Sequence, residues 1–288
     1  MMILKTNSLP LPLLRIIRDK GTEYPFTGEY NDLDIPGTYL CRQCGIALFR
    51  AETKFHSGCG WPSFDQDIPG KVQRLPDADG KRTEILCQRC HAHLGHVFEG
   101  ERMTPLNTRH CVNSLSLDFV ADLEVEDTEE AIFAAGCFWG VEYYFKRLPG
   151  VLKVEVGYTG GYKDNPSYEE ICSGETGHFE AIRVVYDPKK VNFEKITKFF
   201  FEIHDPTQAD GQGPDIGEQY LSVIFYYEKT QQQIAHALIT QLKNKGLPVE
   251  TQVKPVSPFW PAEEYHQDYY QKTGKMPYCH HYVKRFDD

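Results

Sequence analysis

The sequence predicts two domains of different fold class, an all-β domain followed by a domain in which helices and strands form layers. Its 288 residues are enough for two ordinary domains, and its hydrophobic residues, 41% of the total, are enough for two cores. Six of the nine cysteines lie in the first 120 residues, among turns and short strand-like stretches. Beyond residue 130 longer strands alternate with amphipathic helices, and no internal repeat relates the two halves.

The first domain is assigned to residues 1–121. Its strands are expected to be interrupted by tight turns, within residues 38–51, 82–98 and 114–120. The start of the chain is apolar in patches, but Pro10 and Pro12 interrupt it and positive charges follow. Because no small-residue cleavage site appears, we expect a packed N-terminal arm rather than a signal peptide, and a cytoplasmic location.

An acidic linker is predicted at residues 122–129, because seven acidic residues lie between Asp118 and Glu130. The second domain is assigned to residues 130–288. Its elements are expected in the order strand, helix, strand, strand, helix, strand, helix, over residues 130–136, 137–150, 151–161, 177–188, 192–204, 220–227 and 228–246. Pro149-Gly150 and Gly246 end two of these helices, and Asn192 is the expected N-cap of the third.

The composition argues against several classes of function. A formal net charge of −10 disfavours binding to nucleic acids or anionic membranes, which requires a basic surface. No apolar run approaches the roughly 18 residues needed to span a bilayer. Nine cysteines are an odd number, too sparse for a disulfide-built domain, so we expect them to carry chemistry. No haem, flavin or nucleotide motif is visible, and no organic cofactor is expected.

Four cysteines form two CxxC pairs, Cys41 with Cys44 and Cys87 with Cys90. Four thiolates at two turns satisfy a tetrahedral Zn²⁺ with no open position, which predicts a structural zinc site. The spacing between the pairs exceeds that of a zinc ribbon, so the ion would clamp a larger β domain. The alternative is two redox motifs, but neither pair lies at the strand-to-helix junction of a βαβ unit. His91 or His93 could also replace one cysteine ligand.

Two further cysteines of the first half have the surroundings of reactive thiols. Arg109 and His110 directly precede Cys111, and cationic neighbours favour a thiolate. His93 and His96 could deliver a proton at neutral pH. Cys59 lies between two glycines, where a mobile backbone could bring a resolving thiol to a sulfenic acid. The alternative is that both thiols are small buried hydrophobic groups.

Cys137 lies at the first turn of a predicted helix, where the free N–H groups and the helix dipole stabilise a thiolate. Phe138 and Trp139 would form an apolar wall that suits a methyl-sulfur ligand or ordinary core packing. Glu180 lies on the same strand face as apolar residues, which would raise its pKa and keep it protonated, unless it is a surface charge. Further polar candidates for this site are Tyr168, Asp215 and Tyr220.

The first half, from about Leu14 to Val120, resembles the methionine sulfoxide reductase B family in "GTEYPFTGEY", "KFHSGCGWPSF", "HLGHVF", "RHCVNS" and the paired CxxC. This resemblance implies a zinc-containing antiparallel β fold that reduces the R epimer. It implies that Cys111 attacks sulfur, that Cys59 resolves, and that His93 and His96 polarise or protonate the leaving oxygen. It also places Trp61 on the S-methyl group, with Arg109 and Asn113 ordering the site. His110 stands where relatives can carry Phe.

The second half, from about Glu130 onward, resembles the methionine sulfoxide reductase A family in "GCFWG", "GYTGGYKDNPSY", "GETGHFEAIRVVYDP", "HDPTQ", "DIGEQYLSVIFY" and "PAEEYHQDYY". The resemblance implies an α+β fold, here a two-layer sandwich, that reduces the S epimer. Cys137 would be the nucleophile and Glu180 the proton donor. Tyr168 and Tyr220 would bind the oxygen, Asp215 would order the site, and Phe138 with Trp139 would hold the methyl group. Cys279 is the expected resolving thiol and Cys172 its competitor.

Both resemblances imply one reaction, in which free or protein-bound methionine sulfoxide is reduced and thioredoxin recycles the resulting disulfide. An enzyme of this kind repairs oxidised proteins and needs neither nucleic acid nor membrane. Two alternatives remain: a zinc-clamped interaction module joined to a redox sensor, and an enzyme in which one half is active.

Overall fold

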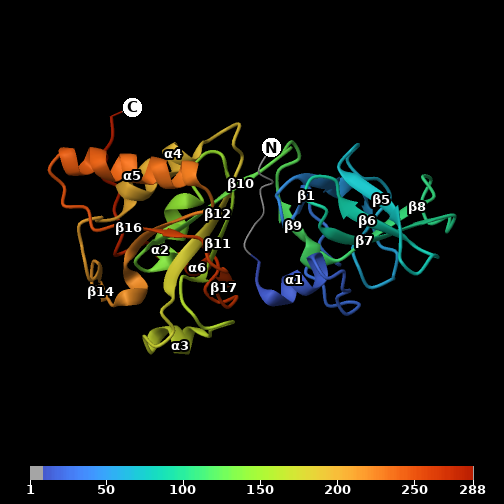
Figure 1. The fold of residues 1–288 in the computed structure, drawn as a ribbon, viewed down its shortest axis with the longest axis horizontal. Helices are drawn as coiled ribbons and strands as arrows, with labels where there is room; N and C mark the ends of the chain where they lie inside the picture. The colour runs from blue at the N-terminus through green and yellow to red at the C-terminus, as the bar shows by residue number, and fades with distance from the viewer. Residues whose placement is uncertain (1–8, 288) are drawn as a thin grey trace. The chain divides into compact units, whose positions relative to one another are not determined.

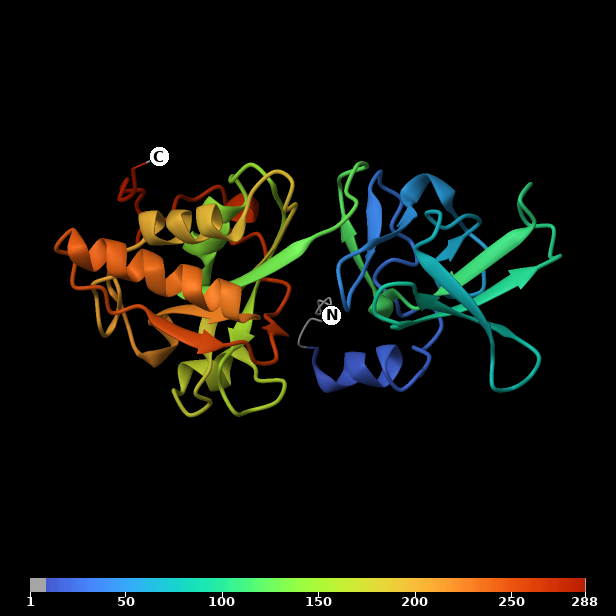
Figure 2. The same cartoon turned by 45° about the horizontal axis from the view of Figure 1, so that its top comes forward.

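Residues 9–287 are described in the computed structural model of the protein, and they divide between Thr128 and Glu129 into two units, each with its own hydrophobic core (Figure 1). The first unit is built from antiparallel strands and the second combines helices with a sheet (Figure 2). The predicted pair of fold classes is therefore confirmed. Among residues 9–287, every helix is too short or too polar to cross a membrane.

The first unit contains two antiparallel sheets. One has the order β2-β1-β9, and the other has the order β3-β4-β8-β7-β6-β5. The strands are β1 (Thr38–Cys41), β2 (Ala47–Arg50), β3 (Lys54–Phe55), β4 (Ser63–Phe64), β5 (Val72–Pro76), β6 (Thr83–Cys87), β7 (His93–Glu99), β8 (Thr108–Val112) and β9 (Leu117–Val120). Two short 3₁₀ turns lie between strands: η1 (Ala51–Thr53) between β2 and β3, and η2 (Ser114–Ser116) between β8 and β9.

The predicted N-terminal arm is packed where it is described, and it contains a short helix, α1 (Leu11–Ile17). Pro12 lies in the first turn of α1, where its missing N–H has no intrahelical partner to lose, so the proline starts the helix instead of breaking it. Ile16 and Ile17 are buried, and Ile17 belongs to the core of the first unit. Residues 1–8 of this arm lie outside the described residues.

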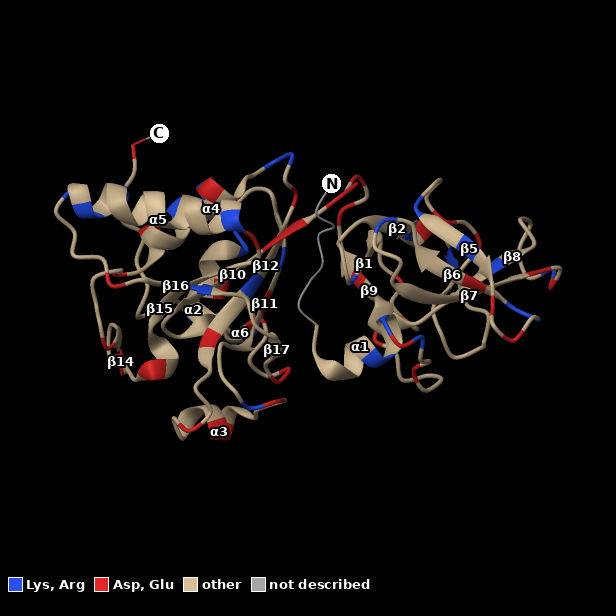
Figure 3. Cartoon of the chain, viewed as in Figure 1, with Lys and Arg blue, Asp and Glu red and all other residues tan. Residues whose placement is uncertain are grey.

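The acidic segment ahead of β10 (Glu129–Ala135) is attached to the first unit, and Figure 3 shows its charges (Figure 3). The hydroxyl of Thr38 donates to the carbonyl of Asp122 at 2.6 Å, and the amide of Ala47 donates to the carbonyl of Glu126 at 3.3 Å. Val125 is 1% exposed. These contacts hold the acidic segment on the first unit, so it is not an unattached linker. The predicted linker boundaries, residues 122–129, stay a prediction.

The second unit has one large sheet of order β16-β15-β10-β12-β11-β17, in which only the β15–β16 pair is parallel. Besides β10, its strands are β11 (Val151–Thr159), β12 (Phe179–Tyr186), β15 (Ser222–Tyr226), β16 (Gln252–Pro255) and β17 (Trp260–Pro261); a separate hairpin joins β13 (Gly211–Gln212) and β14 (Asp215–Ile216). Its helices are α2 (Phe138–Phe145), α3 (Tyr168–Cys172), α4 (Phe193–Ile203), α5 (Lys229–Asn244) and α6 (Tyr269–Thr273), with the turn η3 (Glu218–Tyr220).

Helices α2, α4 and α5 contribute to the same core as one face of this sheet, which gives the predicted two layers (Figure 1). Alternate residues of β12, among them Ile182 and Val184, face that core, whereas Ala181 belongs to a smaller cluster on the other face. The side chain of Asn192 accepts the amide of Lys195 at 2.9 Å, as expected of an N-cap. The strand alternation therefore turns Glu180 toward the helices.

Candidate cysteine sites

The two CxxC pairs fold into two knuckles with the same backbone pattern. Cys41 ends β1 and its amide donates to the carbonyl of Ile46, while Cys87 ends β6 and its amide donates to the carbonyl of Ala92, each at 2.9 Å. Each knuckle turns through a residue with positive φ, Gly45 at +72° and His91 at +59°. Glycine adopts this conformation without strain, and the matched turns aim two thiols each at a common point.

The four sulfurs Cys41, Cys44, Cys87 and Cys90 lie within 4.8 Å of one another. The Cys41–Cys90 and Cys44–Cys87 sulfur pairs are 3.6 Å apart, close to the edge of about 3.8 Å that follows from a tetrahedral Zn–S bond of about 2.3 Å. Burial raises the pKa of the Cys41 thiol, and a bound cation would favour its thiolate form. The geometry and the donor set both fit a four-cysteine metal site.

Neither candidate histidine belongs to this cluster. The His91 ring contacts the side-chain oxygen of Gln73 at 3.3 Å, and the His93 ring contacts Glu84. The four cysteines alone form the group that could hold a metal within the described chain.

The structure brings Cys59 and Cys111 together, with their sulfurs 3.7 Å apart. Cys111 lies on β8, and Cys59 lies on the loop between β3 and β4, where Gly58 and Gly60 have φ of +74° and +95°. The Ser57 hydroxyl contacts the Cys59 sulfur at 3.0 Å. The two thiols can therefore exchange a proton or form a bond after a small movement.

Cross-strand register explains which side chains surround Cys111. Cys111 pairs with Ser63 on β4 and with His96 on β7, and His96 in turn pairs with Glu84 on β6. Residues directly opposite one another in antiparallel strands point to the same face. This row across four strands therefore places His96 beside the Cys111 thiol.

Each predicted histidine of this site is oriented by a carboxylate. The His93 Nδ1 lies 2.7 Å from Glu84, whose other oxygen accepts the Lys20 ammonium at 2.7 Å. The His96 Nε2 lies 2.6 Å from Asp77. His93 is 2% exposed and its Nε2 is buried without a partner in the described structure, while burial lowers its pKa. A buried nitrogen without a protein partner is available to a ligand.

The other predicted residues of the first site hold its framework. Arg109 makes two hydrogen bonds to Glu101, at 2.7 and 2.9 Å. The Trp61 indole N–H donates to the carbonyl of Glu23 at 3.2 Å. The amide side chain of Asn113 accepts the amide of Glu23 at 3.1 Å and donates to the carbonyl of Leu94 at 3.2 Å. Asn113 thus joins the N-terminal segment to β7.

We expected the thiolate of this pair on Cys111, but the pKa shifts favour the negative charge on Cys59. The hydrogen bond from Cys111, with help from the Ser57 hydroxyl, lowers the pKa of Cys59 to about 4, and the same hydrogen bond, together with burial, raises the pKa of Cys111. His110, expected to favour a Cys111 thiolate, alternates to the opposite strand face and packs 5.6 Å from the Phe49 ring. Its burial lowers its pKa, so it brings no cation to the thiol.

In the second unit, Cys137 caps α2 and is 6% exposed. The Glu180 carboxylate accepts the amide of Phe138 at 3.1 Å, directly beside it. Burial raises the pKa of Glu180 to about 8, and the charge of Asp215 adds to this effect. Glu180 is therefore a protonated acid at neutral pH, and it is not the surface charge of the alternative interpretation.

Aromatic rings pack around Phe138, whose amide donates to Glu180. The Phe138 ring lies 5.2 Å from His266 and 5.9 Å from Tyr158, and the Tyr168 ring lies 4.4 Å from His266. Trp139 stacks on Tyr269 at 3.7 Å, and its N–H donates to the His266 Nδ1 at 3.2 Å. These contacts fix the apolar wall predicted from Phe138 and Trp139.

The remaining polar candidates also converge here. Burial raises the pKa of Tyr168 and of Tyr220, and the charge of Glu180 contributes at both, which places the two phenols near that carboxylate. Asp215 accepts the Tyr278 hydroxyl at 3.1 Å from each of its oxygens. Asp215 therefore fixes the residue next to Cys279.

Cys279 is 5% exposed and lies near enough to Cys137 for the two thiols to affect each other's pKa. The interaction between the two thiols lowers the pKa of Cys279 to about 6 and raises that of Cys137, so this pair also favours one negative charge. Cys172 is exposed at the end of α3, and its thiol interacts with the Tyr168 hydroxyl. The structure thus brings Cys279, and not Cys172, to the predicted nucleophile.

Sequence reasoning missed the partners that orient these groups, namely Glu23, Asp77, Glu84, Glu263, His266 and His280. Glu263 accepts the Tyr158 hydroxyl and the Tyr168 amide, both at 2.9 Å. Glu263 and His266 stand in "PAEEYHQDYY", and His280 follows Cys279. A rule that pairs every candidate acid or thiol with nearby histidines and carboxylates would have found His280, but not Asp77 or Glu84.

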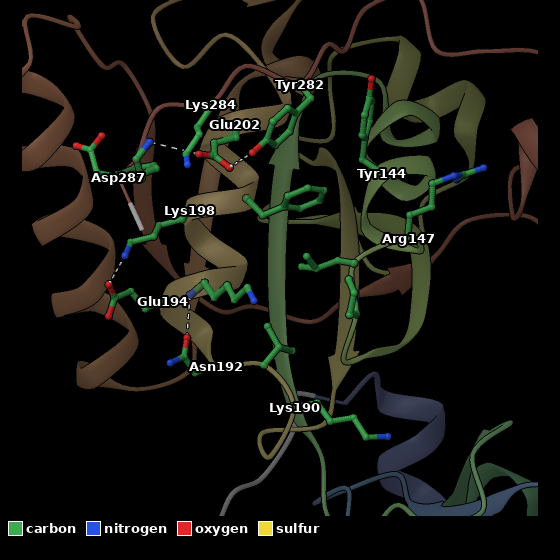
Figure 4. A pocket seen from close by; sticks show the side chains of 16 residues that line it. Tyr144, Arg147, Lys190, Asn192, Glu194, Lys198, Glu202, Tyr282, Lys284 and Asp287 are labelled. Atoms are coloured by element: carbon green, nitrogen blue, oxygen red, sulfur yellow. Dashed lines mark hydrogen bonds and ion pairs between the residues drawn. The ribbon is translucent and has the colours of Figure 1, made fainter.

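A groove of about 800 Å³ lies on the second unit away from these residues (Figure 4). Its lining includes five cations, Arg147, Lys190, Lys195, Lys198 and Lys284, together with residues of the C-terminal tail. None of the predicted site residues lines it.

The chain is similar to known proteins in both halves. Residues 129–288 match the family described as peptide methionine sulfoxide reductase, and residues 12–121 match the SelR domain. The peptide methionine sulfoxide reductase MsrA of Methanosarcina acetivorans is 47% identical over 152 residues, which cover 52% of this chain and 81% of that protein. The MsrA of Geobacter metallireducens is 48% identical over 154 residues, covering 52% and 95%. The crystal structure of reduced Mxr1 from Saccharomyces cerevisiae aligns with a TM-score of 0.50 at 35% identity, covering 53% of this chain and 89% of that one.

Proposed function

The chain belongs to the peptide methionine sulfoxide reductase family, with a SelR (MsrB) domain ahead of the MsrA domain, and we propose that its two units reduce opposite epimers of methionine sulfoxide. The first unit would act on the R epimer and the second on the S epimer, in free methionine sulfoxide and in oxidised proteins. One observation carries this proposal. Each unit holds its own pair of interacting cysteines, together with a buried group that can protonate oxygen.

In the first unit, Cys111 would attack the sulfoxide sulfur after its proton passes to Cys59 across their hydrogen bond. His93, whose Nδ1 is held by Glu84 and whose buried Nε2 has no partner in the described structure, would polarise or protonate the sulfoxide oxygen. His96 lies in register beside Cys111 and would hold the same oxygen. Trp61 would contact the S-methyl group, and Arg109 with Asn113 would keep the strand ends in place.

In the second unit, the Cys137 thiolate would attack sulfur while protonated Glu180 donates its proton to the oxygen. Tyr168 and Tyr220 would hydrogen-bond that oxygen, and Asp215 would order the tail through Tyr278. Phe138 and Trp139 would enclose the methyl group. The amides at the start of α2 would stabilise the negative charge on Cys137 once its proton has passed to Cys279.

Both sites would continue in the same way. The sulfoxide oxygen ends on the nucleophile as a sulfenic acid, and methionine leaves. The resolving thiol, Cys59 or Cys279, displaces this oxygen as water and forms a disulfide. We infer thioredoxin as the reductant, because its potential of about −270 mV is low enough to reduce such a disulfide.

We further propose that the four-cysteine cluster binds Zn²⁺ as a structural ion. Four thiolates leave no open position for a substrate, so the ion would supply folding free energy and take no part in the reaction. Cys41, Cys44, Cys87 and Cys90 would hold it. The ion would fix the two knuckles from which β2 and β7 begin.

The assignment is tested by supplying the two sulfoxide epimers separately, with dithiothreitol, to the wild-type protein and to the Cys111→Ser and Cys137→Ser variants. We expect Cys111→Ser to lose reduction of the R epimer alone, and Cys137→Ser to lose reduction of the S epimer alone. The proposal is wrong if either variant loses both activities or if neither loses any. Absence of turnover by the wild type would favour an interaction module with redox-sensing cysteines.

A further inference from the structure

His280 is a buried histidine in direct contact with the Cys279 thiol. Its Nδ1 lies 3.1 Å from the Cys279 sulfur, and its Nε2 lies 2.6 Å from the carbonyl oxygen of Ala135. The residue is 1% exposed, although it belongs to a tail segment outside any helix or strand. The two ring nitrogens of His280 therefore have different partners: Nδ1 faces the thiol and Nε2 faces the carbonyl oxygen.

The carbonyl of Ala135 settles which nitrogen carries the proton. A carbonyl oxygen only accepts hydrogen bonds, so the His280 Nε2 must be the N–H donor in this contact. In a neutral imidazole the other nitrogen then has a free lone pair, and Nδ1 accepts the proton of the Cys279 thiol. The backbone at the end of β10 thus prepares His280 as a base directed at Cys279.

The space for this ring is created by Gly140 in the first turn of α2. A Cβ at Gly140 would lie 2.1 Å from the His280 Nδ1, closer than any real contact. The backbone around the ring is also held, because the Tyr144 hydroxyl donates to the carbonyl of His280 at 3.3 Å and the Gln212 side chain donates to that of Cys279 at 3.4 Å. The imidazole is therefore held in a buried position by the residues around it. Its contact with the Cys279 thiol is not that of a mobile surface side chain.

We propose that His280 is the general base of the resolving step in the second unit, a role that rests on the proposed function of Cys137 and Cys279. The His280 Nδ1 takes the proton that Cys279 received from Cys137 before the attack on the substrate, and the Cys279 thiolate then attacks the sulfenic sulfur of Cys137. The sulfur–sulfur bond forms as the sulfur–oxygen bond breaks, and the oxygen leaves as water with the proton returned by Nδ1. Cys279 sulfur is oxidised and Cys137 sulfur is reduced, so the step needs no other oxidant.

His280→Gln separates this role from a structural one. The glutamine amide can still donate to the carbonyl of Ala135, but it has no basic nitrogen for the thiol. The neighbouring His281 is exposed, so His281→Gln is the matched control. If His280→Gln does not fold, His280→Asn, which keeps a polar atom near the Nδ1 position without basicity, is measured in the same way.

The experiment is a single turnover of the S epimer without reductant, in which methionine release and disulfide formation are followed separately. For His280→Gln we expect methionine release at the wild-type rate, disulfide formation slowed by about 100-fold, and a trappable sulfenic acid on Cys137. Disulfide formation at the wild-type rate would overturn the role of His280. A parallel loss of methionine release would overturn it too, because it indicates a general disturbance of the site. Failure of the wild type to release methionine would instead refute the proposed function.

Discussion

Glu180 shows how burial converts a common carboxylate into an acid suited to neutral pH. It lies at the start of β12 on the face that the helices cover, and it is 2% exposed. Its hydrogen bond from the Phe138 amide favours the charged form, but burial outweighs this bond and raises its pKa to about 8. A protonated carboxyl at pH 7 gives the second unit a proton donor without a histidine.

The pH dependence of S-epimer reduction follows from this pKa. The acid form of Glu180 dominates below about pH 8 and is lost above it, so the single-turnover rate should fall as the pH rises through that value. Glu180→Gln keeps an acceptor for the Phe138 amide but has no proton to give, and we expect a rate about 100-fold lower. Rapid-quench measurements between pH 6 and pH 10 test both statements.

R-epimer reduction by the same Glu180→Gln protein is the internal control, and it should keep the wild-type rate. A falling limb that persists in Glu180→Gln would assign the titration to another group. A variant rate within about threefold of wild type would rule out Glu180 as the proton donor.

At the scale of elements, strand register and the matched turns bring together residues that lie far apart in the sequence. Cys111, His96 and Glu84 come from three strands, yet their pairing places them in one row on one sheet face. The two knuckles reach one point because each closes with the same hydrogen bonds. The CxxC spacing made the cysteine cluster predictable, because ligand spacing within a knuckle is local.

The partners of the histidines were not predictable in this way. Nothing in the sequence near Asp77 or Glu84 indicates which strand edge they will face, because sheet order is set by tertiary packing. The helices with strong periodicity, α4 and α5, were predicted close to their bounds. The five-residue helices α3 and α6 and the two-residue strand β17 are too short to carry a periodic pattern, and they were missed.

Removal of one knuckle ligand should affect the first unit alone. Cys44 is fully buried, and Cys44→Ser removes one of four sulfurs, so we expect the loss of bound zinc and of R-epimer reduction. Zinc binding in small structural sites contributes about 10–16 kcal/mol to folding, so the unit should unfold at a lower temperature. Metal analysis, thermal unfolding and epimer-specific activity measure the effect.

Cys172→Ser is the matched control, because Cys172 is exposed and lies outside the cluster. It should keep the wild-type metal content. Retention of zinc and of R-epimer reduction by Cys44→Ser would show that Cys44 is not a required ligand.

At the scale of the whole molecule, the tail of the second unit shows what pattern analysis cannot reach. Residues 274–287 form no helix or strand, yet Arg285 donates to the carbonyl of Phe201 at 2.8 Å, and Glu202 accepts the amide of Arg285 at 3.0 Å. These contacts with α4 fix a segment that delivers both Cys279 and His280 to Cys137. The resemblance of the sequence to a known family indicated Cys279, whereas the path of the tail was needed to find His280.

Each unit contains a complete set of reacting groups, which predicts that the two activities are independent. In the first unit the two sulfurs lie 3.7 Å apart, and in the second the Cys137 and Cys279 thiols are close enough to shift each other's pKa, so neither nucleophile needs a thiol from the other unit. An equimolar mixture of Cys111→Ser and Cys137→Ser, at the total chain concentration of the wild type, should therefore reduce each epimer at half the wild-type initial rate. Thioredoxin-supported turnover of each epimer measures this. Rates well below half would mean that one unit assists the other within a chain, and that the fusion couples two reactions instead of only joining them.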